Sequence, residues 1–278
     1  MSNLIETIIK TRELTADILT KSLVNIENNT ETEIAQKILS EVKNHKEIFQ
    51  EGWYSPPPFG VAVLLDEKPF KRLEYDSLRK PEFEPSHDIY FGKETVGMIF
   101  FSPIDKKTNM IGDIGFTVYN GTKKEIQNHL KNSYKAILDI AKHAEVGMTF
   151  DEVCSFADNR LKKNFKITRW ITKHSDPNTM NIGHTIPGSY ENINFGGTFD
   201  EIKSTVTKGR IYIKENENFK IPETCAFTVE SRLEDINNSN LPSVYFHFIV
   251  CFNKSKKIIL ENFDQIFSKV GMDYMNKN

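Results

Sequence analysis

Apolar side chains recur at helical spacing in several parts of the chain. Residues 3–28 carry them at steps of three and four, which predicts an amphipathic helix. A second helix is expected from Thr30, because a glutamate three residues later completes the capping-box pattern. The same arguments predict a long helix over 123–144, a helix that begins at Thr149 and a closing helix over 262–275.

Short apolar runs rich in β-branched and aromatic residues lie between these segments and predict strands. The runs at 96–102 and 110–119 are separated by a polar turn, so they should form a hairpin. The polar stretches at 66–92 and 188–222 are expected to be loops. Helices and strands mixed in this way indicate the α+β class. The other expected strands are 61–65, 226–233, 244–252 and a last one that includes 258–260.

Composition limits the size of the core and the class of partner. The chain has 278 residues, of which 38% are hydrophobic, and this suits one sizeable core. We expect a helical lead-in over 1–50 and a single compact unit over 51–278. The formal net charge of −2 gives no general attraction to nucleic acid or to an anionic membrane.

The cysteines and the N-terminus indicate a cytoplasmic protein. The three cysteines are far apart and form no CxxC pair, so neither a zinc knuckle nor a disulfide framework is indicated. No apolar run approaches the roughly 20 residues that a membrane span needs. The first residues also lack the basic and apolar regions of a signal peptide.

Five short motifs follow one another in a fixed order, and together they resemble a known family. Their order and spacing are similar to those of the methionine aminopeptidase, prolidase and creatinase family of metallopeptidases. The resemblance covers residues 52–260 and implies the pita-bread fold, in which curved antiparallel sheets are flanked by helices. The motifs are Gly-Asp-Ile-Gly at 112–115, Glu-Val-Gly-Met-Thr at 145–149, Asn-Ile-Gly-His-Thr-Ile-Pro at 181–187, Phe-Thr-Val-Glu at 227–230 and Val-Tyr-Phe-His-Phe-Ile-Val at 244–250.

The resemblance implies a metal site that is only partly retained. The family binds two divalent ions through two Asp, one His and two Glu side chains. Asp113, His184 and Glu230 match three of these ligands, whereas Ser102 and Phe246 stand at the positions of the other two. One ion is therefore expected instead of two. One His and two carboxylates suit Fe(II), Mn(II) or Zn(II).

Other positions are expected to line a substrate pocket. Tyr54 stands where the family has a proton-handling histidine, and Glu191 replaces a second histidine and is a candidate general base. Ser102 and Phe246 should face the pocket beside Tyr54. Strand alternation then places His247 on the opposite face, so we expect His247 to be a structural histidine.

Three functions are compatible with these residues. The first is a single-metal enzyme that acts on a small amino-acid-like or amide substrate by hydrolysis or, with iron, by oxidation. The second is a metal-free hydrolase similar to creatinase, with His184 and Glu230 as acid–base partners. The third is a non-catalytic binding protein, a pseudoenzyme. Ordinary two-metal aminopeptidase activity is not expected. Family members often dimerise, so a homodimer is a further expectation.

Overall fold

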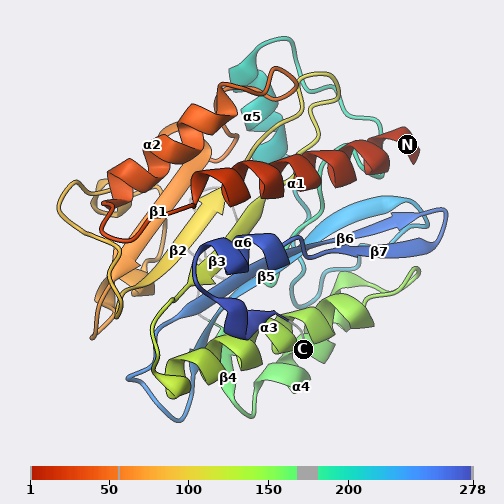
Figure 1. The fold of residues 1–278 in the computed structure, drawn as a ribbon. Coiled ribbons are helices and arrows are strands. Elements are labelled where there is room, and N and C mark those ends of the chain that lie inside the picture. The colour runs from red at the N-terminus through yellow and green to blue at the C-terminus, as the bar shows by residue number, and fades with distance from the viewer. Residues whose placement is uncertain (1, 56, 168–180, 277–278) are drawn as a thin grey trace.

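The computed structural model describes residues 2–55, 57–167 and 181–276. In these residues, helices surround one antiparallel sheet whose strand order in space differs from the order along the chain (Figure 1). The α+β class expected from the sequence is confirmed. The helices are α1 (Ser2–Ser22), α2 (Glu31–Val42), α3 (Lys124–His143), α4 (Phe150–Leu161), α5 (Phe199–Lys208) and α6 (Asp264–Lys269). The strands are β1 (Val61–Asp66), β2 (Val96–Phe101), β3 (Ile114–Val118), β4 (Phe165–Ile167), β5 (Cys225–Asp235), β6 (Val244–Asn253) and β7 (Lys256–Leu260).

The strand order brings the C-terminal strands into the middle of the sheet. The order is β1-β2-β3-β6-β5-β4, with β7 paired to β6, and the paired strands are antiparallel. β3 and β6 meet at the pair Phe116 and Phe246. Residues far apart in the sequence therefore become neighbours at this junction.

Two of the predicted helix starts are confirmed, and a third was missed. Thr30 and Thr149 each form the expected capping box before α2 and α4. The first helix ends at Ser22 instead of residue 28, and the closing helix is only the short α6. The expectation of a loop over 188–222 is wrong at α5, where Thr198 and Glu201 form a third capping box.

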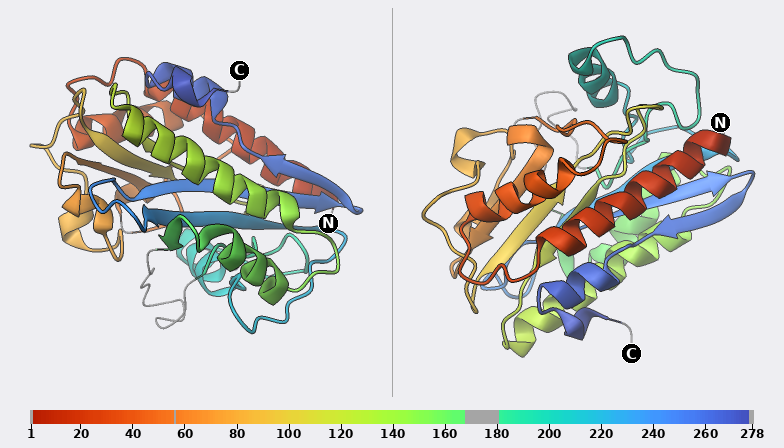
Figure 2. Two further views of the ribbon diagram at one scale, coloured as in Figure 1. Left: turned by 90° about the horizontal axis from the view of Figure 1, so that it is seen from below. Right: turned by 45° about the horizontal axis from the view of Figure 1, so that its top comes forward.

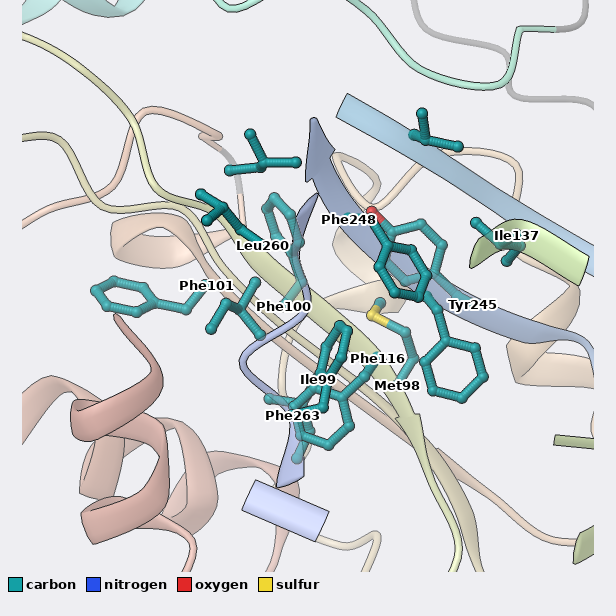
Figure 3. Packing of buried hydrophobic residues seen from close by; sticks show 14 of the residues in the cluster. Met98, Ile99, Phe100, Phe101, Phe116, Ile137, Tyr245, Phe248, Leu260 and Phe263 are labelled. Atoms are coloured by element: carbon teal, nitrogen blue, oxygen red, sulfur yellow. The ribbon is translucent and has the colours of Figure 1, made fainter. Parts of the chain in front are cut away.

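Helices α1, α3 and α6 lie together along one side of β6 and β7 (Figure 2, left). Aromatic side chains fill the space between them and the sheet. The Phe116 ring lies 6.2 Å from the Phe263 ring (Figure 3), and the Phe246 ring lies 5.2 Å from the Tyr134 ring of α3. The other face of the sheet is thereby left for the loops that form the candidate site.

The N-terminal helices pack on the same sheet, since α2 contacts β1 and α1 contacts β3 and β6. The expected boundary between 1–50 and 51–278 stays a prediction. At the crossing of α1 and the start of β3, Gly112 leaves no room for a side chain. In the part of the chain that the structure describes, none of the helices has the length and apolar character needed to cross a bilayer.

Gly112→Ala is expected to lower the free energy of unfolding by about 1–3 kcal/mol. An added Cβ would lie 2.5 Å from the Arg12 backbone nitrogen and 2.6 Å from the Thr11 carbonyl carbon, so α1 would have to move. Urea unfolding followed by circular dichroism measures the change. Gly197→Ala is the control, because nothing lies within 4 Å of its added Cβ. Equal losses in the two variants would contradict the close approach of α1 to the sheet.

Candidate functional site

A small cavity lies between the sheet and the loops on the face opposite to α3 and α6. Its volume is about 60 Å³. This is far below the roughly 300–1,000 Å³ of pockets that hold drug-sized ligands. Its wall includes aromatic side chains such as Trp53, Tyr54 and Phe100. Its polar groups come from Asp113, His184, Arg210, Glu230, Tyr245 and His247.

Asp113 is buried beside β3 and is held by two residues from distant parts of the chain. Trp53 Nε1 donates to both carboxylate oxygens, at 3.0 and 2.9 Å. Arg12 from α1 donates to the Asp113 backbone carbonyl. Burial raises the pKa of the Asp113 carboxyl well above its ordinary value, although the Trp53 hydrogen bonds oppose this shift.

His184 is placed by a turn that approaches β5 closely. Gly183 has a φ of +140°, and an added Cβ there would meet the Thr228 carbonyl oxygen, so only glycine fits. The His184 backbone N–H donates to Thr228 Oγ1 at 2.9 Å. Nδ1 lies 3.0 Å from the Thr185 carbonyl oxygen, which can only accept, so Nδ1 carries the ring hydrogen.

The other ring nitrogen of His184 faces Glu230. Nε2 is an acceptor in this tautomer and lies 3.3 Å from Glu230 Oε1. A proton held between the two groups would satisfy both. Burial lowers the pKa of His184 to about 3, and the Arg210 charge adds to that effect. Burial raises the pKa of Glu230, while hydrogen bonds from Tyr245 and Thr228 oppose the shift.

The expected orientations of Phe246 and His247 are wrong. His247 lines the cavity, together with Tyr245, whose hydroxyl donates to Glu230 Oε2. Phe246 points to the other face and packs against Tyr134 and Phe263. His247 is the cross-strand partner of Glu230, so the sequence register was one residue out. Such a shift exchanges the two faces of a strand.

Of the other expected site residues, only Tyr54 lines the cavity. Ser102 is buried outside it, where its hydroxyl accepts from the Tyr54 backbone N–H at 3.2 Å and donates to the Gly60 carbonyl at 3.1 Å. It therefore ties down the turn that carries Trp53. Glu191 is exposed and does not line the cavity. This position does not support the expected role of Glu191 as a general base.

Sequence reasoning missed two arginines of the site. Arg12 lies on α1 and reaches the cavity wall through the core, and only the buried position of an arginine inside an apolar helix face could have indicated it. Arg210 follows α5, and its guanidinium carbon lies 5.0 Å from the Trp53 ring and 5.3 Å from the Tyr212 ring. The residues next to Arg210 in the sequence form no motif that could have indicated its role. Trp53 was not among the expected site residues, and its indole N–H proves to hold Asp113.

The donor set does not fit a metal ion. Among the residues described, no group of three or more His, Cys, Asp or Glu side chains is arranged to hold one. Both Asp113 oxygens already accept from Trp53, and Glu230 accepts from Tyr245 and Thr228. The Arg210 cation faces the same cavity and opposes a second positive charge. The single-metal site expected from Asp113, His184 and Glu230 is therefore not supported.

Comparison with solved structures identifies the fold. The chain is similar to X-Pro aminopeptidase from Thermotoga maritima (TM-score 0.61, 16% identity, 94% of this chain and 61% of that one). It is also similar to prolidase from Pyrococcus furiosus (0.60, 15%, 94% and 64%) and to a variant of Escherichia coli aminopeptidase P in complex with substrate (0.62, 12%, 99% and 60%). These matches confirm the pita-bread fold.

These matches cover only part of each solved structure. The chain spans about three fifths of the length of these structures, from 60% to 64%. At such low identity the likeness establishes the fold and not the activity. No protein-family model matches the sequence, and no match is found among curated proteins.

Trp53→Phe is expected to cost about 1–3 kcal/mol of unfolding free energy, because both oxygens of a buried carboxyl lose their donor. Asp113→Asn in the same background should recover part of the loss. A double-mutant cycle by urea unfolding measures the coupling, expected at about 1 kcal/mol or more. Additive effects would show that the indole N–H does not stabilise Asp113.

Metal analysis of the purified, untagged protein should find well under one ion per chain after incubation with Mn(II), Fe(II) or Zn(II) under anaerobic conditions. The physical reason is that the carboxylate oxygens already accept hydrogen bonds from the chain and that the Arg210 cation faces the same cavity. The matched variant is His184→Ala, which should contain the same small amount. One ion per wild-type chain that is lost in the variant would overturn this prediction.

Proposed function

We propose that this protein is a metal-independent hydrolase that cleaves a C–N bond in a small amide or amino-acid-like substrate. The observation that carries the proposal is the contact of His184 Nε2 with Glu230 Oε1 at 3.3 Å on the wall of a small cavity. Two proton-handling groups within hydrogen-bond reach are what general acid–base catalysis requires.

The tautomer of His184 assigns a role to each group. Nδ1–H is fixed by the Thr185 carbonyl, so Nε2, which faces Glu230 in the absence of substrate, is the nitrogen that takes a proton from an attacking water. The protonated Glu230 carboxyl gives its proton to the leaving nitrogen as the C–O bond forms and the C–N bond breaks. The His184 imidazolium then returns a proton to Glu230, and both groups regain their starting states.

Arg210 supplies a binding contact for an anionic part of the substrate. Its Nε donates to the Thr207 carbonyl at 3.0 Å, and the Trp53 and Tyr212 rings both lie close to the guanidinium. The structure gives its terminal nitrogens no carboxylate partner among the described residues. A free carboxylate would pair with this fork in the bidentate manner that arginine favours. Amino acids and N-acyl amino acids meet that requirement.

The size of the cavity and the comparisons also support this proposal. A volume of about 60 Å³ favours a compact ligand over a long peptide. The solved structures with this fold include an X-Pro aminopeptidase and a prolidase. These names favour hydrolysis over oxidative chemistry. The homodimer and the cytoplasmic location expected from the sequence stay predictions.

A non-catalytic binding protein is the second candidate, and one observation favours it. Tyr245 and Thr228 both donate to Glu230, and Trp53 donates to both oxygens of Asp113. Carboxylates held in this way are well suited to a fixed binding surface. Tight binding of a small carboxylate without turnover would support this alternative.

Turnover of a panel of dipeptides, N-acyl amino acids and creatine, followed by release of amine, tests the hydrolase. Activity should be unchanged in an about 10-fold molar excess of a strong chelator. His184→Ala and Glu230→Gln should each lower kcat/KM by about 100-fold or more, as expected for the loss of an acid–base group.

The matched control is His87→Ala, because His87 is exposed and does not line the cavity. It should leave turnover unchanged. Activity that disappears with the chelator and returns with a divalent ion would reject the metal-independent reaction. Activity that survives both site substitutions would reject the assigned residues.

A further inference from the structure

We propose that Arg12 of helix α1 fixes His247 in a single tautomer, so that His247 offers its Nε2–H to an acceptor oxygen of the ligand. Arg12 is then a positioning residue, and His247 is the group that contacts the ligand. The inference deepens the proposed function, on which it rests for the class of ligand. The tautomer itself is independent of any activity.

The contacts of Arg12 define the tautomer. Its side chain is fully buried, and Nη1 lies 3.3 Å from His247 Nδ1. A guanidinium has only donors, so Nδ1 must be the acceptor and the ring hydrogen must be on Nε2. Nη2 also donates to the His247 carbonyl at 2.8 Å and to the Glu261 carbonyl at 2.9 Å. The guanidinium is therefore held in place while it orients the ring.

The position of His247 makes its second nitrogen available. His247 lies in the middle of β6, opposite Glu230, and its ring centroid is 6.3 Å from that of Phe100 on the cavity wall. No hydrogen bond of Nε2 is found among the described residues. In a cavity with apolar walls, a donor of this kind pairs strongly with an oxygen of a bound ligand.

The two histidines of the cavity present opposite groups. His184 carries its hydrogen on Nδ1 and leaves Nε2 as an acceptor, whereas His247 carries its hydrogen on Nε2 and is a donor there. His184 Nε2 already faces Glu230 Oε1, so the group left for the ligand to satisfy is the His247 donor, which needs an acceptor oxygen. An amide carbonyl provides that oxygen. This pattern selects N-acyl amino acids within the class of substrates proposed above, with Arg210 as partner of the carboxylate.

A purely structural role for Arg12 would leave a different signature. Arg12 joins α1 to the Asp113 carbonyl and to β6, so its loss would destabilise the fold under either explanation. Stability alone is therefore not a test. The tautomer of His247 and the effect of its two closest replacements on ligand binding depend on the proposed role.

Long-range ¹H–¹⁵N spectra of the protein labelled with ¹⁵N-histidine report the tautomers. His247 should be neutral with hydrogen on Nε2, and His184 should be neutral with hydrogen on Nδ1. His129 is the internal reference for the Nε2–H form, because its Nε2 lies 3.0 Å from the Pro242 carbonyl oxygen. Arg12→Lys, where it folds, should give a mixed pattern at His247 alone. Hydrogen on Nδ1 of His247 in the wild type would overturn the proposal.

Binding of N-acetylglycine, measured by calorimetry, tests the contact with the ligand. His247→Gln places an amide donor near the position of Nε2 and should keep the affinity within about 3-fold. His247→Asn retains only a group near Nδ1 and should lose about 10-fold or more, the usual size of one hydrogen bond to a buried partner. His129→Gln is the control, because His129 lies outside the cavity.

The outcomes separate this inference from the proposed function. Binding that follows the Gln and Asn variants as expected, without any hydrolysis, supports the role of His247 and rejects the hydrolase. Hydrolysis that is unchanged in His247→Asn rejects the role of His247 and leaves the hydrolase standing. Failure of the wild type to bind N-acetylglycine overturns the contact between His247 and an amide.

Discussion

The buried guanidinium of Arg12 is the interaction on which the site depends. Burial lowers the pKa of Arg12 to about 9, and the buried charge is stabilised by carbonyl acceptors of its two terminal nitrogens. Carbonyls of Asp113, His247 and Glu261 supply acceptors from the residue before β3, from β6 and from the segment after β7. One side chain from α1 thus joins the junction of the sheet to the N-terminal helix. The same contact orients His247.

Local physical chemistry made much of the fold predictable. Capping boxes at Thr30 and Thr149 mark helix starts through hydrogen bonds within four residues, so the sequence alone contains them. Gly112 and Gly183 stand where another backbone approaches too closely for a side chain, which is why their motifs carry fold information. The third box at Thr198 has the same signal and is followed by apolar residues at helical spacing, Phe199, Ile202 and Val206, so this helix was also predictable from the sequence.

The site was predictable only where its residues lie within those motifs. Asp113, His184 and Glu230 come together around one cavity, as expected from their motifs. Phe246 does not, because the face of a residue in β6 depends on pairing with β5 across the sheet, and one residue of error reverses it. Arg12 and Arg210 come from segments that the fold brings near, so no local pattern could place them at the cavity.

The arrangement explains how this scaffold can carry carboxylates without a metal. A divalent ion needs oxygen and nitrogen lone pairs that are free and directed inward. Here the chain's own donors already direct hydrogen bonds to the carboxylate oxygens, with the Trp53 indole on Asp113 and the Tyr245 hydroxyl on Glu230. Each of these donors opposes the rise in carboxyl pKa that burial causes, and the Arg210 charge opposes it further. The replacement of an ion by fixed donors also changes what the cavity can recognise. Its fixed N–H and O–H groups favour ligands with acceptor oxygens and a negative charge.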